Sequence, residues 1–203
     1  MSENRQADSY RSISSPSSGL YKEFGSKFIS FAYPVISEEE IKDILTRLRS
    51  EYFDARHHCY AYRLGLKGDI WRTNDDGEPS SSAGRPIFGQ ILSKELSDIL
   101  VVVVRYFGGT KLGIPGLIKA YKTATYDAIE NADIIDKIAT ERISFSFDYL
   151  NMEAVMKLIK SSGVDIAEQR FDLRCIISVD VRLSECDSLR KSLNNIEGIN
   201  FEF

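Results

Sequence analysis

The chain has 203 residues and a formal net charge of −4, and hydrophobic residues make up 43% of it. This composition is typical of globular proteins, and the length is enough for one large domain or two small ones. It excludes a disordered chain and a polycation. No apolar run reaches the ~18 residues of a spanning helix, so we expect no membrane contact.

Cysteine usage and the first residues indicate a compartment. Cys59, Cys175 and Cys186 are odd in number and widely spaced, so we expect reduced thiols and neither disulfides nor a zinc site. The first residues show no charged-then-apolar signal pattern, which predicts a cytoplasmic protein.

The first quarter of the chain predicts a tail, a strand and a helix. Residues 1–19 contain seven serines and few apolar residues, which predicts a disordered, serine-rich tail. Alternating residues over 23–35 predict a strand or strand pair. Ser37 and Glu40 form a capping-box pattern, and the apolar residues behind them recur at helical spacing, which predicts an amphipathic helix over 38–52.

The next segment predicts a strand over 57–64 and a turn over 74–79. Within the turn, Asp-Gly accepts positive φ and Glu-Pro disfavours a helix. The three serines that follow, residues 80–82, are a plausible helix start.

The stretch 99–121, ILVVVVRYFGGTKLGIPGLIKAY, organises the rest of the chain. Its six-residue apolar run predicts a strand buried on both faces, and its glycines predict a tight turn before a helix over 114–131. Residues 99–126 carry four basic residues and no acid. The helix places its lysines away from its apolar stripe, which leaves them free for solvent or a ligand.

The last third has the pattern β-α-β-β-α-β in about 65 residues, which is typical of a ferredoxin-like split unit. We therefore predict an α+β protein of two domains, residues 20–138 and residues 139–203, after the tail.

Three sequence blocks carry a family resemblance: DARHHCYAY (54–62), DDGEPSSSAGRP (75–86) and VVVRYFGGTKLGIPGLIKAY (102–121). They resemble the signature blocks of the IMPACT/YigZ family in its bacterial two-domain form. The resemblance implies an N-terminal α/β sandwich similar to ribosomal protein S5 domain 2. It also implies a ferredoxin-like C-terminal domain resembling the last domain of elongation factor G.

The resemblance also implies a role in translation. Eukaryotic relatives are translational regulators that restrain a starvation-responsive kinase pathway, with a further N-terminal partner-binding domain that we do not expect here. Bacterial relatives suggest ribosome or nucleic-acid association without an accepted reaction. Two departures stand out: Ser81-Ser82 replaces the family's usual Gly-Thr, and Pro115 stands where glycine is common.

The glycine turn is the principal candidate site. Backbone amides at a helix start, flanked by cations, favour an anion such as a nucleic-acid phosphate. The alternative is that the glycines only permit a sharp, closely packed turn. The candidate anion-binding residues are Arg105, Gly108, Gly109, Lys111, Gly113, Gly116, Lys119 and Lys122.

Arg105 has a second interpretation. An arginine next to a buried strand usually needs a carboxylate partner, so it can instead pair with Asp75, Asp76 or Glu78 and hold the turn.

The catalytic candidates are weak. Glu78, Asp76 and His57 could perform acid–base chemistry if the fold places the histidine beside the turn, but turn formation explains Asp76 and a core hydrogen bond explains a histidine. We expect no metal, because the ligand spacing is missing, and no cofactor.

These observations favour a binding protein over an enzyme. The leading hypothesis is a translation-associated regulator that binds RNA or the ribosome through a basic, glycine-rich face. The alternatives are a hydrolase or transferase acting on a phosphorylated or peptide substrate, and a protein-interaction module with a partner in translation control.

Overall fold

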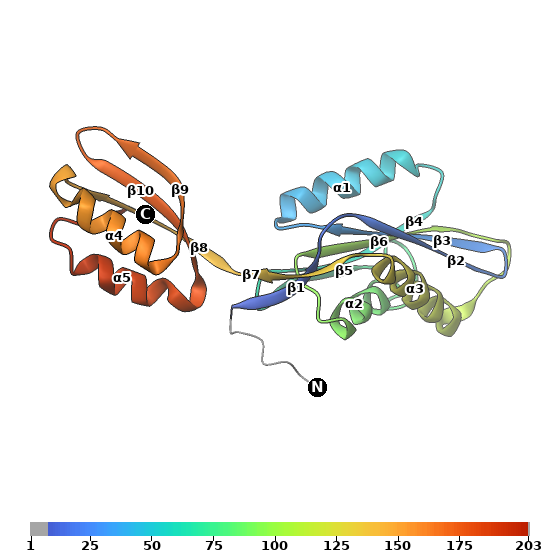
Figure 1. The fold of residues 1–203 in the computed structure, drawn as a ribbon. Coiled ribbons are helices and arrows are strands. Elements are labelled where there is room, and N and C mark those ends of the chain that lie inside the picture. Colours follow the sequence, from blue (N-terminus) through green and yellow to red (C-terminus); the bar gives the residue numbers. More distant parts are fainter. Residues whose placement is uncertain (1–7, 203) are drawn as a thin grey trace. The chain divides into compact units, whose positions relative to one another are not determined.

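The computed structural model describes residues 8–202 (Figure 1). They divide into two compact units: an N-terminal unit of residues 10–137, and a C-terminal unit of residues 138–202 together with residues 8–9. The division falls after Lys137, one residue before the predicted boundary. Each unit has its own hydrophobic core.

The N-terminal unit is built on a five-stranded sheet in the order β2-β3-β6-β4-β5, with every neighbouring pair antiparallel. Its strands are β2 (Ser17–Glu23), β3 (Ser26–Pro34), β4 (His57–Leu64), β5 (Ile70–Asn74) and β6 (Ile99–Tyr106). The central strand β6 contains the apolar run, and residues 99–104 are all 0% exposed. The prediction of a strand buried on both faces is confirmed.

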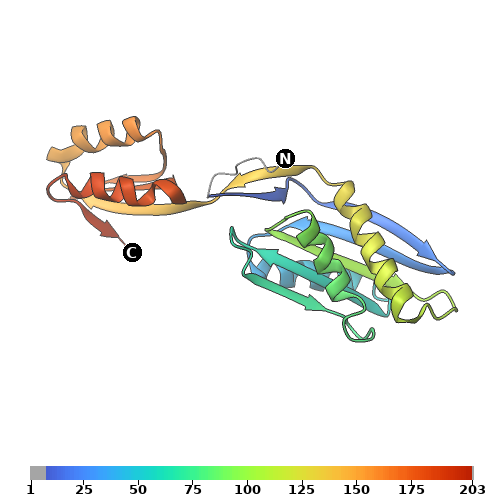
Figure 2. The same cartoon turned by 90° about the horizontal axis from the view of Figure 1, so that it is seen from below.

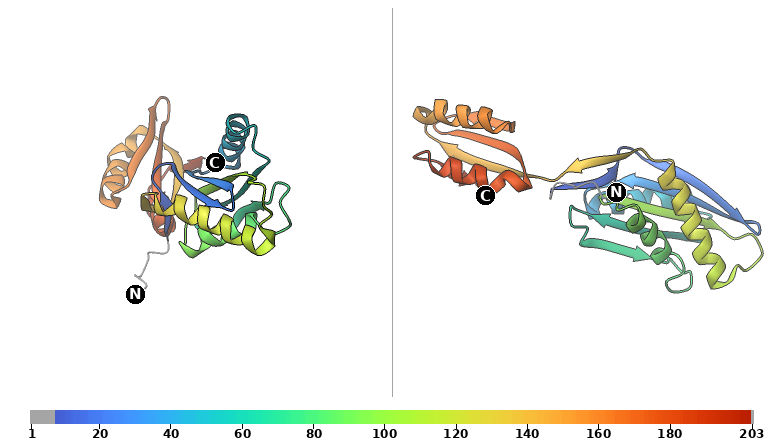
Figure 3. Two further views of the ribbon diagram at one scale, coloured as in Figure 1. Left: turned by 90° about the vertical axis from the view of Figure 1, so that its right-hand side faces the viewer. Right: turned by 60° about the horizontal axis from the view of Figure 1, so that its bottom comes forward.

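Helices cover both faces of this sheet. Helix α1 (Glu38–Glu51) lies on one face, and helices α2 (Gly84–Ser93) and α3 (Gly113–Glu130) lie on the other (Figures 1, 2 and 3). The N-terminal sheet has a hydrophobic core on each face, and alternate residues of β4 point into one core or the other. Cys59 and Ala61 belong to the core under α2 and α3, whereas Tyr60 and Tyr62 belong to the core under α1. The unit is thus the predicted α/β sandwich.

The start of α1 follows the predicted capping pattern with one difference. The backbone N–H of Glu40 donates to Oγ of Ser37 over 3.2 Å. The Glu40 carboxylate accepts from the N–H of Ile36, one residue earlier than a standard capping box requires. The Ser37 contact satisfies one of the amides that a helix end otherwise leaves unpaired, and the Glu40 contact ties the preceding residue to the first turn.

The prediction of a disordered tail over 1–19 is wrong for the part that the structure describes; residues 1–7 lie outside it. Strand β1 (Ser9–Ile13) pairs with β7 (Ile134–Ile138), and β2 begins at Ser17. Ile13 is buried in the core. The serines find distant partners: Oγ of Ser17 donates to the carbonyl of Ala128 over 2.7 Å.

Local composition concealed these strands because β1 pairs with the distant β7, and β2, which pairs with the neighbouring β3, also packs against the distant helix α3. Gly19 shows how close the packing is, since a Cβ there would lie 2.5 Å from the backbone nitrogen of Ala128 on α3. Strand β5 was also not predicted; its Trp71 stacks on Phe88 of α2 at a centroid distance of 4.9 Å.

The C-terminal unit confirms the predicted β-α-β-β-α-β order. Its elements are β8 (Thr140–Phe147), α4 (Met152–Ser162), β9 (Asp165–Phe171), β10 (Cys175–Arg182), α5 (Cys186–Asn194) and β11 (Asn200–Glu202), with 3₁₀ turns at Tyr149–Asn151 and Leu183–Glu185. The sheet order β11-β8-β10-β9 is that of a ferredoxin-like domain. Among the described residues, no helix is both long and apolar enough to cross a membrane.

We expect Ser37→Ala to lower the free energy of unfolding by about 1 kcal/mol, because the substitution removes the side-chain acceptor at the start of α1. Urea denaturation measures this loss. Ser50→Ala is the matched control: it lies exposed in the same helix, where alanine is neutral or slightly stabilising. Equal effects of the two substitutions would contradict a capping role for Ser37.

Candidate functional site

The turn over residues 74–79, which we call the acidic turn, is stabilised by hydrogen bonds to its own aspartates. The carboxylate of Asp75 accepts from the backbone N–H groups of Ser81, Ala83 and Gly84 at 2.8, 2.9 and 2.8 Å. These contacts join the turn to the first residues of α2 and satisfy amides at that end. Asp75 therefore has a structural role, as turn chemistry predicts.

Asp76 joins the same turn to the other face of the sheet. Its carboxylate accepts from the Arg49 guanidinium at 2.7 Å and from the backbone N–H of His58 at 2.6 Å. Burial alone would raise the pKa of Asp76, but these donors outweigh it and lower the pKa. The charged aspartate therefore fixes the turn against α1 and β4. His57 makes a further contact to the turn, since its Nδ1 lies 2.8 Å from the Asp76 carbonyl oxygen.

Glu78 lies at the centre of a buried hydrogen-bond network. Its Oε1 accepts from Arg105 at 2.6 Å and from the Tyr121 hydroxyl at 2.8 Å. The side chains of Glu78 and Arg105 are only 4% and 7% exposed. The Cys59 thiol donates to the Tyr121 hydroxyl at 3.3 Å, and burial raises the pKa of both groups.

This network corrects the expected position of Arg105. The side chain does not lie on the surface beside the glycine turn, because the guanidinium is paired with Glu78 and packs over the ring of Phe28 at 5.4 Å. A buried charge needs such a partner, so the structural alternative holds.

The geometry does not favour catalysis. The Glu78 carboxylate is enclosed by its donors, and Asp76 and His57 are both engaged in holding the turn. Among residues 8–202, no group of three or more His, Cys, Asp or Glu is placed to hold a metal ion.

The glycines between β6 and α3 divide into two kinds. Gly108 permits a close approach, because a Cβ there would lie 1.9 Å from the carbonyl carbon of Gly25 in the β2–β3 turn. Its N–H also donates to Oγ of Ser26 over 3.2 Å. Gly109 and Gly113 have φ of 90° and 68°, in the left-handed region that favours glycine. Gly108 is therefore a packing residue, whereas Gly109 shapes the exposed loop.

The start of α3 explains the departure at Pro115. Pro115 lies in the first turn of the helix, where a backbone N–H has no intrahelical partner in any case. Gly116 follows it, half-buried against the side chain of Leu112. The departure at Ser81 is different: its φ is 62°, so a serine occupies a conformation that glycine adopts at lower cost.

The lysines of the predicted site differ in whether they form ion pairs. Lys111 and Lys122 are exposed and form no ion pair with any residue of the described chain. Lys119 is paired with Glu23 of β2 at 3.0 Å, and this hydrogen bond raises the pKa of the lysine. The ion pair joins α3 to the β2–β3 hairpin, and the lysine side chain stays 64% exposed.

Two further features were missed from the sequence. Lys22 and Lys27 are exposed and directly opposite each other on β2 and β3, beside the loop between β6 and α3.

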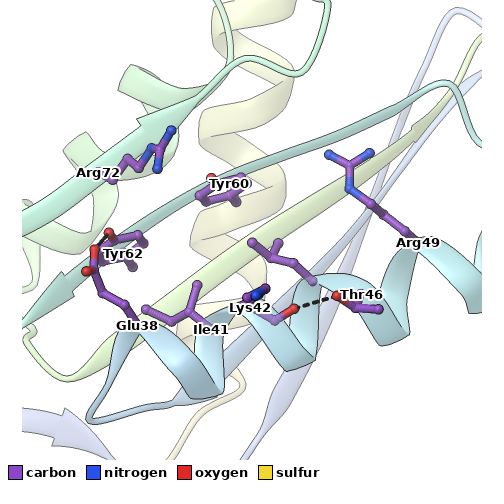
Figure 4. Close-up of a pocket in the computed structure, with 9 residues that line it drawn as sticks. Glu38, Ile41, Lys42, Thr46, Arg49, Tyr60, Tyr62 and Arg72 are labelled. Carbon is purple, nitrogen blue, oxygen red and sulfur yellow. Dashed lines mark hydrogen bonds between the residues drawn. The ribbon is translucent and has the colours of Figure 1, made fainter.

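A groove of about 350 Å³ also lies between α1 and the strands β4 and β5. Figure 4 shows Arg72 and Arg49 toward opposite ends of this groove, with Tyr60 between them.

Periodicity within one segment cannot reveal such pairings, because each feature joins separate elements. The signal for the lysine pair was the spacing of Lys22 and Lys27 around Phe24-Gly25, which becomes a cross-strand pair once a two-residue turn is assumed.

The Impact N-terminal domain matches residues 24–129, which include the acidic turn, the buried network and the glycine loop. The chain belongs to the IMPACT family. The predicted resemblance is confirmed.

Individual relatives agree with this assignment. The IMPACT family member in the pol 5′ region of Thermus thermophilus is 35% identical over 143 residues, covering 70% of this chain and 76% of that protein. YvyE of Bacillus subtilis is 35% identical over 124 residues, 61% of this chain, which span 57% of YvyE. A crystal structure of a hypothetical protein shares the fold, with a TM-score of 0.73 at 24% identity and 96% coverage of each chain.

We expect Glu78→Gln to lower the free energy of unfolding by roughly 3 kcal/mol or more, because it leaves the Arg105 charge buried without a counter-ion. Chemical denaturation measures the loss. Tyr121→Phe is the control: it removes one hydrogen bond to the same oxygen and costs about 1 kcal/mol. Similar losses in the two variants would contradict a dominant ion pair.

His58 provides a test of the pH dependence of stability. Burial, followed by the Arg49 charge, lowers the pKa of His58 below its ordinary 6.5. The unfolded chain therefore binds more protons than the folded chain below that value, and the stability falls as the pH drops from about 7.5 to 5.5, by at most roughly 1.4 kcal/mol per pH unit.

We expect His58→Gln to flatten this decline, measured by urea denaturation at each pH. Identical slopes in wild type and His58→Gln would show that His58 does not account for the loss.

Proposed function

We propose that this protein binds the phosphate backbone of RNA, as part of a translation-associated role, through the exposed surface where β6 leads into α3. The observation that carries the proposal is the pair Lys111 and Lys122, which are exposed and have no carboxylate partner among residues 8–202. Exposed cations without internal partners are available to phosphates, which dominate the affinity of nucleic-acid binding.

The surroundings of the two lysines support this function. Lys119 lies between them in sequence and stays exposed although it is paired with Glu23, and residues 99–126 contain no acid. The net charge of −4 disfavours non-specific attraction by the whole chain, so a local basic surface has to supply it. The IMPACT resemblance supports the translational context.

The test is an RNA-binding titration of Lys111→Glu/Lys122→Glu against wild type at several salt concentrations. We expect weaker binding to all RNA sequences and a salt slope reduced by roughly 1.4, since each lost phosphate contact on a single strand removes about 0.7. Ribosome co-sedimentation gives a second readout.

The control is Lys157→Glu/Lys160→Glu, which makes the same charge change on the exposed side of α4 in the C-terminal unit. Equal weakening in both variants would show that only net charge matters. An interaction with ribosomes that survives nuclease digestion of the RNA would favour a protein partner instead.

A further inference from the structure

The tip of the β2–β3 hairpin holds a bulky residue in an unfavourable conformation. The two strands are joined by Phe24 and Gly25, with φ of 45° and 78°. Two-residue hairpin turns with positive φ at both positions favour Asn-Gly or Asp-Gly. A phenylalanine there is an outlier, and the backbone conformation costs stability.

Folding does not explain this phenylalanine. Its side chain is 69% exposed, and it belongs to none of the core clusters and none of the aromatic pairs in the described part of the chain. A small polar residue would serve the turn better. A large, rigid ring held in solvent at some cost to stability is instead suited to contact with a ligand.

A second exposed aromatic lies next to the turn. The backbones of Gly25 and Gly108 are in contact, and we call this contact the junction. Phe24 directly precedes Gly25, and Phe107 directly precedes Gly108. Phe107 is 52% exposed, and the Arg105 guanidinium lies 5.7 Å from its ring centroid. Figures 1 and 3 show the hairpin tip and the loop between β6 and α3 at the same end of the N-terminal unit.

The two segments that meet at this junction carry exposed lysines. Lys22 and Lys27 face each other directly across the hairpin, an arrangement that is destabilising unless an anion intervenes. Both are exposed, and neither has an ion-pair partner among residues 8–202. Lys111 of the adjoining loop adds a third unpaired charge. Exposed rings and unpaired lysines on adjoining segments suit a single-stranded nucleic acid, which offers base faces for stacking and phosphates for charge.

We propose that the Phe24–Gly25 turn is a stacking site for an unpaired RNA base, with Lys22 and Lys27 binding the flanking phosphates. This inference rests on the proposed function and narrows it to single-stranded RNA. A duplex keeps its base faces stacked inside the helix and offers the ring nothing to contact. The lysines favour a polyanion over an apolar protein surface.

The test is Phe24→Asn, because stability and affinity are expected to move in opposite directions. Asparagine suits the turn, so the denaturation midpoint should rise. Affinity for a 12-nucleotide single strand should fall roughly tenfold, which is within the range for loss of one base–aromatic stack. The salt slope should stay the same, since no phosphate contact is removed. Phe24→Tyr keeps a ring and should retain the affinity.

The outcomes separate this inference from the proposed function. If Lys111→Glu/Lys122→Glu weakens RNA binding while Phe24→Asn does not, the stacking site is wrong and the proposed function stands. If wild type binds no RNA, both are wrong. Equal loss of single-stranded and duplex RNA in Phe24→Asn, or loss in Phe24→Tyr as large as in Phe24→Asn, overturns stacking on an unpaired base. The stacking site is also wrong if Phe24→Asn loses binding to a protein partner while its affinity for RNA is unchanged.

Discussion

The buried ion pair of Arg105 and Glu78 is the interaction on which the N-terminal unit depends. Arg105 belongs to the central strand, Glu78 to the acidic turn and Tyr121 to α3, so the network joins three segments of the chain at one carboxylate oxygen. Because Arg105 is buried and paired with Glu78, its charge is neutralised inside the unit.

This arrangement separates structural charges from available ones. The carboxylates of the acidic turn are all occupied by donors from α1, β4, β6 and the start of α2. The lysines of the β6–α3 loop and the hairpin lie outside that network. Because the carboxylates of the acidic turn are occupied internally, they do not pair with these lysines.

The packing of the hairpin against the loop between β6 and α3 leaves aromatics exposed. Gly108 lets the loop between β6 and α3 contact the hairpin turn, and Lys119 reaches Glu23 from α3. Through these two contacts the hairpin turn that carries Phe24 lies against the loop that carries Phe107. A rigid scaffold carrying exposed rings and charges on loops is a common arrangement for a binding site.

By itself, the sequence determined most elements: the helix over 38–52, the buried central strand, the lysine-bearing helix and the ferredoxin-like order of the last third. Each of these depends on local periodicity, caps or turn residues. Only the tertiary structure decided that the serine-rich segment forms strands, because β1 pairs with the distant β7 and β2, which pairs with β3, packs against the distant helix α3. It also decided that Arg105 is internal and that the Phe24–Gly25 turn lies against the loop between β6 and α3, since burial and neighbourhood are set by contacts between segments that are distant along the chain.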